Sequence, residues 1–161
     1  MGIARPPRFV VDAMLGRLAR WFRALGYDTL YLGQVEDRRL LRISRAEERI
    51  LVTRDRMLAR LGEPLSCLIH SELVDDQLRE AVHRLSLSAG EAHWLSRCLE
   101  CNAVLEPRER AGVQGLVPEH VLATQAAFTA CPGCSRIYWA GSHADRMLER
   151  IQRVFGRAER R

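Results

Sequence analysis

Two C-x-x-C pairs constrain this chain more than any other part of its sequence: Cys98-Leu-Glu-Cys101 and Cys131-Pro-Gly-Cys134. They are separated by 29 residues. At this spacing four thiolates can surround one tetrahedral zinc ion, with Zn–S bonds of about 2.3 Å. The segment from about Ser96 to His143 is poor in apolar runs, so we expect it to fold around the metal. An active site would then belong to the residues before Ser96.

Two disulfides are the alternative for the same four cysteines, and they would require an oxidising compartment. The first seven residues, MGIARPP, lack the apolar segment of a signal peptide. No apolar run approaches the roughly 20 residues that cross a bilayer. We therefore expect a cytoplasmic protein that holds zinc and does not contact membranes. Cys67 lies in the apolar run Leu65–Ile69 and is expected to be a small core side chain.

The formal charge of the chain is +5, and it contains no lysine, so all basic side chains apart from histidine are arginines. Four thiolates and one Zn²⁺ would lower the formal charge to +3. This modest basic excess permits a polyanionic partner such as RNA but does not require one.

The residues before Ser96 alternate between strand and helix patterns. Strands are expected at 9–11, 27–32, 50–53 and 65–69. Helices are expected at 14–25, from Asp37 as N-cap to about 49, up to Leu61, and at 76–87. On the first helix, Arg17, Arg20 and Arg23 are predicted to form the exposed face. A β-α-β-α order of this kind predicts a parallel sheet with helices on both faces.

Aspartates follow two of these strands, and ligands gather at the carboxyl ends of parallel strands. Asp12 follows the first strand, Asp55 follows the third, and Asp37 opens the helix between them. Carboxylates about 5 Å apart repel by roughly 3 kcal/mol per pair at an effective dielectric of 20, so a cation is expected among them. Hard oxygen ligands favour Mg²⁺ or Mn²⁺, which would suit hydrolysis of a phosphodiester. As an alternative, each aspartate could simply cap a helix.

Several segments of the chain resemble the Mut-seven C-terminal ribonuclease domain of the PIN-like nuclease group. They are DAMLGRLARW (12–21), LGYDT (25–29), RILVTRDR (49–56), SRCLECN (96–102) and CPGCSRIYWAGSH (131–143). The resemblance covers nearly the whole chain. It implies a PIN-like α/β nuclease core over 1–95, a four-cysteine zinc ribbon over 96–143 and a C-terminal helix over 144–161.

The resemblance also implies a metal-dependent endoribonuclease. Asp12 and Asp55 match the acids of the first strand and of the T-R-D element, and Asp37 matches the acid that opens the second helix in related chains. A fourth acid is usual in the group. The candidates are Asp28, Glu36, Glu47, Asp75 and Asp76, and for Glu47 a structural ion pair is the favoured interpretation.

Four arginines are candidate substrate ligands. Arg54 and Arg56 flank Asp55, and Arg17 and Arg20 lie on the same helix face near Asp12, so all four are placed to hold RNA phosphates. Solvated charged side chains are the alternative. Thr53 is similarly open between a role near the metal and simple strand propensity.

Three functions remain compatible with the sequence. The first is a Mg²⁺- or Mn²⁺-dependent ribonuclease whose zinc ribbon helps to hold RNA. The second is a non-catalytic RNA-binding or adaptor protein, and the third is the nuclease component of a toxin-like system with a protein partner.

Overall fold

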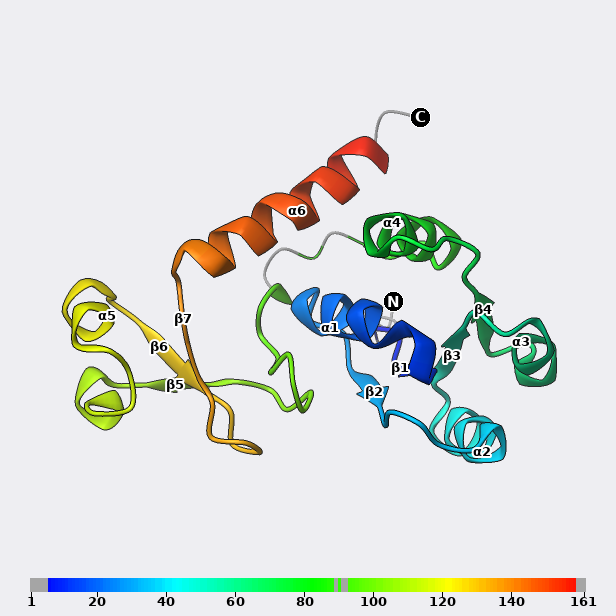
Figure 1. The fold of residues 1–161 in the computed structure, drawn as a ribbon, viewed down its shortest axis with the longest axis horizontal. Helices are drawn as coiled ribbons and strands as arrows, with labels where there is room; N and C mark the ends of the chain where they lie inside the picture. Colours follow the sequence, from blue (N-terminus) through cyan, green and yellow to red (C-terminus); the bar gives the residue numbers. More distant parts are fainter. Residues whose placement is uncertain (1–5, 89, 91–92, 159–161) are drawn as a thin grey trace, which may run out of the picture.

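A four-stranded parallel sheet forms the N-terminal part of the molecule in the computed structural model, which describes residues 6–88, 90 and 93–158 (Figure 1). Its strands are β1 (Phe9–Val11), β2 (Thr29–Tyr31), β3 (Ile50–Thr53) and β4 (Ser66–Leu68), in the order β2-β1-β3-β4. The register places Val11 between Tyr31 and Val52, so the carboxyl ends of the strands are level. The α/β fold expected from the sequence is therefore confirmed.

Helices cover both faces of this sheet. One face carries α1 (Gly16–Ala24) and α4 (Val74–Arg84), and the other carries α2 (Asp37–Glu47) and α3 (Arg56–Gly62). Strand β1 is fully buried because both of its faces are covered. Phe9 and Val11 join the core with α1 and α4, whereas Val10 joins Leu40 and Leu58 in the second core. This burial explains why β1 reads as a continuous apolar run rather than an alternating one.

The predicted helix boundaries need small corrections. The first helix begins with a 3-10 turn (Ala13–Leu15) before α1, and α4 begins at Val74, two residues before the predicted start. Helix α6 (Ser142–Ala158) runs from the ribbon back towards α4, against which it packs (Figure 1). Its side chains Met147, Ile151, Val154 and Phe155 join the core of the N-terminal part. The division into a nuclease core, a zinc ribbon and a C-terminal helix remains a prediction. The C-terminal helix α6 does share apolar contacts with the core of the N-terminal part. No helix in the described ranges is long and apolar enough to cross a membrane.

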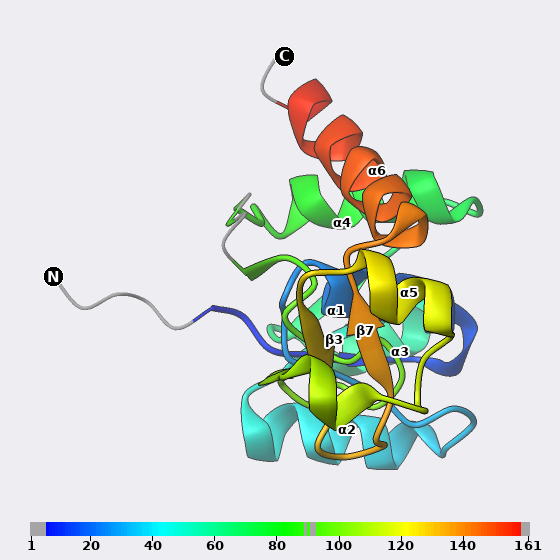
Figure 2. The same cartoon turned by 90° about the vertical axis from the view of Figure 1, so that its left-hand side faces the viewer.

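A second, antiparallel sheet follows the first cysteine pair. It contains β5 (Glu106–Arg108), β6 (Phe128–Ala130) and β7 (Ile137–Trp139), in that order, and Figure 2 views it with α5 (Glu119–Thr124) beside it. The segment between β5 and β6 also contains a 3-10 turn (Arg110–Val113). Four buried side chains form a small separate core here: Val113, Val117, Val121 and Phe128.

The first cysteine pair docks on the edge strand β2. The side chain of Asn102 accepts a hydrogen bond from the Thr29 amide at 2.9 Å and donates one to Asp28 at 2.7 Å. Asn102 adopts a positive φ of 73°, a conformation that asparagine tolerates better than most residues. Arg97 adds a hydrogen bond from Nε to the Gly26 carbonyl at 3.0 Å.

Arg23 corrects the sequence prediction, because it is buried and does not belong to an exposed face. Its Nε donates to the Thr29 carbonyl at 3.0 Å, and its Nη1 donates to the carbonyls of Leu99 and Glu100 at 3.0 and 2.8 Å. The side chain is only 5% exposed. The guanidinium group lies among carbonyl oxygens that would otherwise lack donors, which is why a charged residue is stable in this position.

Two ion pairs of Arg49 lie beside this contact between the first cysteine pair and β2. Arg49 donates to both carboxylate oxygens of Asp28, at 2.8 and 3.1 Å, and to Glu47 at 2.7 Å. Burial alone would raise the pKa of Asp28, but hydrogen bonds from Arg49 and Asn102 lower it below its ordinary value. The structural ion pair expected for Glu47 is confirmed, and its partner is Arg49.

The loop after β4 is held by one carboxylate, that of Glu80 on α4. Glu80 accepts hydrogen bonds from the backbone amides of His70 and Ser71 and from the Ser71 hydroxyl, and it pairs with Arg84 at 3.0 Å. Burial would raise its pKa, but the hydrogen bonds from Ser71 and His70 lower it to about 2.

Asn102→Ala is expected to destabilise the whole fold by about 2 kcal/mol, because it leaves the buried Thr29 amide without an acceptor. The matched control is Gln152→Ala on the exposed side of α6, which should change stability by less than about 0.5 kcal/mol. Urea unfolding monitored by circular dichroism measures both. Equal midpoints for the two variants would show that the docking of the cysteine pair contributes nothing to stability.

Glu80→Gln is expected to lower the free energy of unfolding by about 2 kcal/mol at pH 7. The folded pKa of Glu80, about 2, lies below the ordinary value of about 4.3, so its contribution is complete above about pH 5. The contribution is lost as the pH falls from about 4.3 towards 2, and the two proteins should converge there.

Urea unfolding at several pH values compares wild type with Glu80→Gln. Glu149→Gln, at an exposed position on α6, is the control and should show no such convergence. A difference between wild type and Glu80→Gln that stays constant from pH 7 to pH 3 would contradict the assigned role.

Candidate functional site

The sheet has a topological switch point between β1 and β3, and two of the predicted acids lie there. The chain leaves β1 for β2 on one side and returns to β3 on the other side, and ligands of open α/β sheets usually bind at the carboxyl ends of strands at such a point. Asp12 directly follows β1, and its amide donates to the Val52 carbonyl of β3 at 3.0 Å. Asp55 lies two residues after the end of β3.

Thr53 joins these two acids. Its hydroxyl donates to Asp12 Oδ2 at 2.8 Å and accepts a hydrogen bond from the Asp55 amide at 2.9 Å. The residue is 0% exposed. A buried hydroxyl with a fixed donor and a fixed acceptor has one orientation, so it holds one oxygen of Asp12 in place. Strand propensity alone does not account for this threonine.

The helix-cap interpretation is correct for Asp55 and not for the other two acids. Asp55 Oδ1 accepts from the Leu58 amide at 2.8 Å and caps α3. Asp12 precedes a 3-10 turn but makes no side-chain cap bond. The cap prediction for Asp37 is wrong by one residue: Glu36 occupies the N-cap position of α2, and Asp37 is the first residue inside the helix.

The three carboxylates do not converge on one point. Across residues 6–88, 90 and 93–158, no three carboxylate or histidine side chains place their ligand atoms within 4.8 Å of one another. Asp12 and Asp55 are linked through Thr53, whereas Asp37 is an exposed residue at the start of α2. Because α2 follows β2, its first residue still lies on the side of the sheet where the strands end.

The candidate fourth acids differ in position. Asp28 precedes β2 and Glu47 ends α2, so both lie at the opposite edge of the sheet, paired with Arg49. Asp75 pairs with Arg150 and Asp76 with Arg79, on α4. Of the five, Glu36 alone has no hydrogen bond or ion pair from its side chain to another described residue.

The four candidate substrate arginines also differ. Arg54 lies 3.7 Å from Glu72, and Arg20 lies 3.1 Å from Glu100. Arg17 and Arg56 are exposed and have no side-chain partner among the described residues. Arg56 begins α3 directly after Asp55, and Arg54 directly precedes Asp55, so these two arginines are equally near to Asp55 in sequence.

The four cysteines do converge. Their Sγ atoms lie within 4.8 Å of one another, with 3.5 Å between Cys98 and Cys134 and 3.2 Å between Cys101 and Cys131. A disulfide would bring two sulfurs to about 2.05 Å, and a ZnS₄ tetrahedron separates them by about 3.8 Å. These cysteines are free thiols in an arrangement that fits a metal such as zinc and is consistent with a zinc ribbon. Cys67 is buried and separate from them, as predicted.

Tyr138 extends the cysteine cluster, because its hydroxyl lies 3.2 Å from Cys98 Sγ. Burial alone would raise the pKa of Cys98, but hydrogen bonds from Tyr138 and from the backbone amides of Cys101 and Glu100 lower it to about 6. A thiol with a low pKa is readily deprotonated, as metal binding requires. Tyr138, on β7, thus contacts the first cysteine pair.

The cysteine cluster and the acids lie at opposite edges of the parallel sheet. Asn102, which directly follows the first cysteine pair, contacts Thr29 at the start of β2, whereas Asp12 and Asp55 follow the ends of β1 and β3. A metal held by the cysteines would therefore lie away from Asp12 and Asp55. The distance between the cysteine cluster and the acids follows from the order and direction of the strands.

Comparisons with known proteins agree on one family. Residues 7–151 match the family model described as the Mut7-C RNAse domain. The protein named Exonuclease mut-7 homolog, from Homo sapiens, is 35% identical over 105 residues, which are 62% of this chain and 12% of that protein. The chain thus spans a small fraction of that relative. No solved structure matches the chain. Because the family model covers most of its length, this chain belongs to the Mut7-C RNAse domain family.

Proposed function

We propose that this chain is a metal-dependent endoribonuclease that hydrolyses RNA phosphodiester bonds at the ends of β1 and β3. Membership of a family described as an RNAse domain supports nuclease chemistry, and the curated relative is named as an exonuclease. The observation that carries the proposal is the hydrogen-bonded chain from Asp12 through Thr53 to Asp55 at the switch point of the sheet.

The donor set at this point suits Mg²⁺ or Mn²⁺. Mg²⁺ is commonly held by one or two carboxylates, with waters and substrate phosphates completing its shell, so a three-carboxylate cluster is not required. Thr53 binds Oδ2 of Asp12 and Leu58 binds Oδ1 of Asp55, and neither of the remaining two oxygens has a hydrogen bond to a described residue. These two oxygens are the proposed first ligands, with Asp37 as a third acid that approaches when RNA binds. The ion would lower the pKa of the attacking water.

Each residue of the site then has a definite task. Thr53 fixes the orientation of Asp12, and the cap bond to Leu58 fixes that of Asp55. Arg54 and Arg56 are proposed to hold the scissile phosphate, because guanidinium groups pair with phosphate in a bidentate manner. Arg17 and Arg20, on α1, would contact a more distant part of the backbone.

The ion at Cys98, Cys101, Cys131 and Cys134 is proposed to be zinc, with a structural role. Thiolate sulfurs in a tetrahedral set select zinc over the hard cations. By holding the two cysteine pairs together, zinc would fix the ribbon and, through Asn102 and Arg23, the outer side of β2. Assistance with RNA binding is a further proposed role of the ribbon.

Asp55→Asn is expected to reduce RNA cleavage at least about 100-fold. Asparagine is as good a helix cap as aspartate, so the variant removes the negative charge and keeps α3 intact. Cleavage of a mixed RNA pool with Mg²⁺ or Mn²⁺ added or withheld measures the effect. Chelators are avoided because they would also remove zinc.

Asp145→Asn is the matched control, since it makes the same chemical change at an exposed position in the first turn of α6. It should cleave like the wild type. Undiminished cleavage by Asp55→Asn would contradict the assignment of this acid. If both proteins bind RNA and neither cleaves it, the non-catalytic RNA-binding function is favoured.

Cys98→Ser is expected to lose the zinc ion and unfold the ribbon while the helical signal of the α/β core largely remains. Metal analysis of the purified protein should fall from one zinc per chain towards none, and limited proteolysis should cut between β5 and β7. Cys67→Ala, which removes the thiol outside the cluster, should retain its zinc. Unchanged zinc in Cys98→Ser would exclude the four-cysteine site.

A further inference from the structure

The exposed side of α2 is a strongly basic helix surface that the proposed active site leaves unused. Four arginines lie between residues 38 and 46, and this stretch contains no acidic residue. Arg38, Arg39 and Arg42 are exposed and have no side-chain partner in the described part of the chain. Arg45 differs, because its guanidinium group donates to the Leu61 carbonyl of α3 at 2.8 Å. Elsewhere, Arg20, Arg54, Arg79, Arg84 and Arg150 pair with acids.

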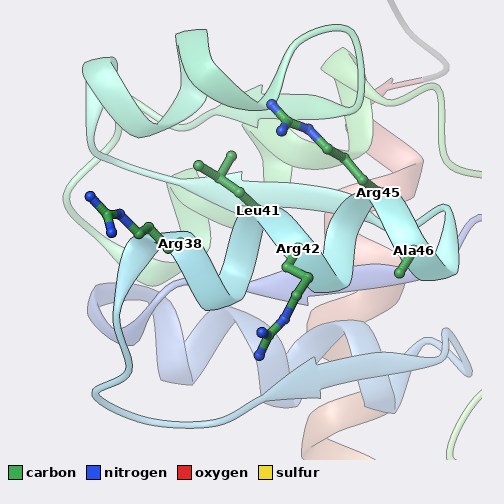
Figure 3. Close-up of a pocket in the computed structure, with 5 residues that line it drawn as sticks. All are labelled: Arg38, Leu41, Arg42, Arg45 and Ala46. Atoms are coloured by element: carbon green, nitrogen blue, oxygen red, sulfur yellow. The ribbon is translucent and has the colours of Figure 1, made fainter.

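Figure 3 shows how these side chains leave the helix. Arg38 and Arg45 extend from the two ends of the surface, with Leu41 between them. In this view Leu41 and Arg45 point above the helix and Arg42 points below it. Residues three and four apart on a helix are neighbours, about 5–6 Å apart at Cβ. The attachment points of Arg38, Arg42 and Arg45 therefore form a row along α2 at intervals of about one helical turn, and their guanidinium groups spread to both sides of this row.

Two adjoining open hollows lie along this row. The first, about 590 Å³, is lined by Arg38, Leu41, Arg42, Arg45 and Ala46. The second, about 820 Å³, is lined by Gln34, Val35, Glu36, Arg38, Arg39 and Arg42. Arg38 and Arg42 line both of them. Each hollow combines guanidinium groups with an apolar patch, from Leu41 and Ala46 in the first and from Val35 in the second.

The row leads to the candidate active site. The second hollow includes the residues just before Asp37, where the chain arrives from the carboxyl end of β2. Asp12 and Asp55 follow the ends of the two neighbouring strands, β1 and β3. A polymer that lies along α2 towards its first turn therefore approaches the edge of the sheet that carries these acids.

We propose that this surface, formed by Arg38, Arg39, Arg42 and Arg45 of α2, binds the phosphate backbone of single-stranded RNA and directs the strand to the acids. The inference rests on the proposed ribonuclease function and adds a binding surface to it. Charge complementarity identifies the occupant, because the guanidinium groups of Arg38, Arg39 and Arg42 have no partner among the described residues and can pair with the phosphates of a strand. The apolar patches in the hollows suit the faces of unstacked bases, which a carboxylate-rich peptide does not offer.

The test measures RNA binding by the full zinc-containing chain without added Mg²⁺ or Mn²⁺, so that binding is separate from cleavage. The probe is a fluorescein-labelled single-stranded RNA of about 20 nucleotides, long enough to cover both α2 and the acids. Fluorescence anisotropy is recorded from about 50 to 200 mM salt. The test variant is Arg38→Gln/Arg42→Gln, which neutralises the two residues that line both hollows.

The expected result is an affinity at least about tenfold weaker at low salt, because two charged contacts are lost. The slope of log affinity against log salt should become less steep by about 1.4, since each single-strand phosphate contact contributes about 0.7. Arg38→Lys/Arg42→Lys keeps both charges and should retain the wild-type slope. Arg146→Gln/Arg153→Gln removes two exposed arginines from α6 and is the matched control, with no change expected.

Three results would overturn the inference. They are an unchanged salt slope in Arg38→Gln/Arg42→Gln, an equal loss in the α6 control, and wild-type protein that binds a labelled polyglutamate peptide but not RNA. The last result would indicate an acidic protein partner. Failure of the nuclease proposal is distinguishable: binding that depends on α2 without any metal-dependent cleavage supports the surface and contradicts the enzyme. Metal-dependent cleavage by a protein whose RNA binding does not depend on α2 supports the enzyme and contradicts the proposed surface.

Discussion

Hydrogen bonding at the outer side of β2 is the constraint on which the two parts of this molecule depend. As an edge strand, β2 exposes backbone groups that must find partners or attract another strand. Here Asn102 accepts from the Thr29 amide and Arg23 donates to the Thr29 carbonyl, so these two side chains take the place of a neighbouring strand. Arg23 also binds the carbonyls of Leu99 and Glu100, and one guanidinium group thereby connects helix, sheet and cysteine pair.

The same sheet separates two kinds of chemistry. The cysteine cluster contacts its amino-terminal edge, and the acids of the candidate active site lie at its carboxyl edge. Both positions follow from parallel strands in the order β2-β1-β3-β4, because every strand begins at one edge and ends at the other. The soft thiol cluster and the hard carboxylate oxygens are thus kept apart, and on the proposed function the two sites would select different metals.

Rigid support distinguishes the acids from one another. Asp12 and Asp55 are each fixed by a hydrogen bond, through Thr53 and through the Leu58 amide, so their free oxygens are held in place before any ligand arrives. Asp37 has no such hydrogen bond among the described residues. It lies at the start of α2, next to the arginines of the basic surface and on the side of the sheet where Asp12 and Asp55 lie. On the proposed function, RNA approaching along α2 would bring phosphate to Asp37 first and to the fixed pair afterwards.

The sequence by itself determined the class of fold, the four-cysteine cluster and the aspartates at the strand ends, because these depend on local spacing. Apolar runs of four residues, C-x-x-C pairs and an acid directly after a strand need no information from distant residues. Tertiary structure alone decided the burial of Arg23 and the role of Thr53. Each depends on a contact that the local pattern does not encode: Arg23 looks exposed on its own helix because the Leu99 and Glu100 carbonyls that bury it come from about 76 residues further along the chain. The register between β1 and β3, fixed only when the sheet forms, made Thr53 a link between two acids.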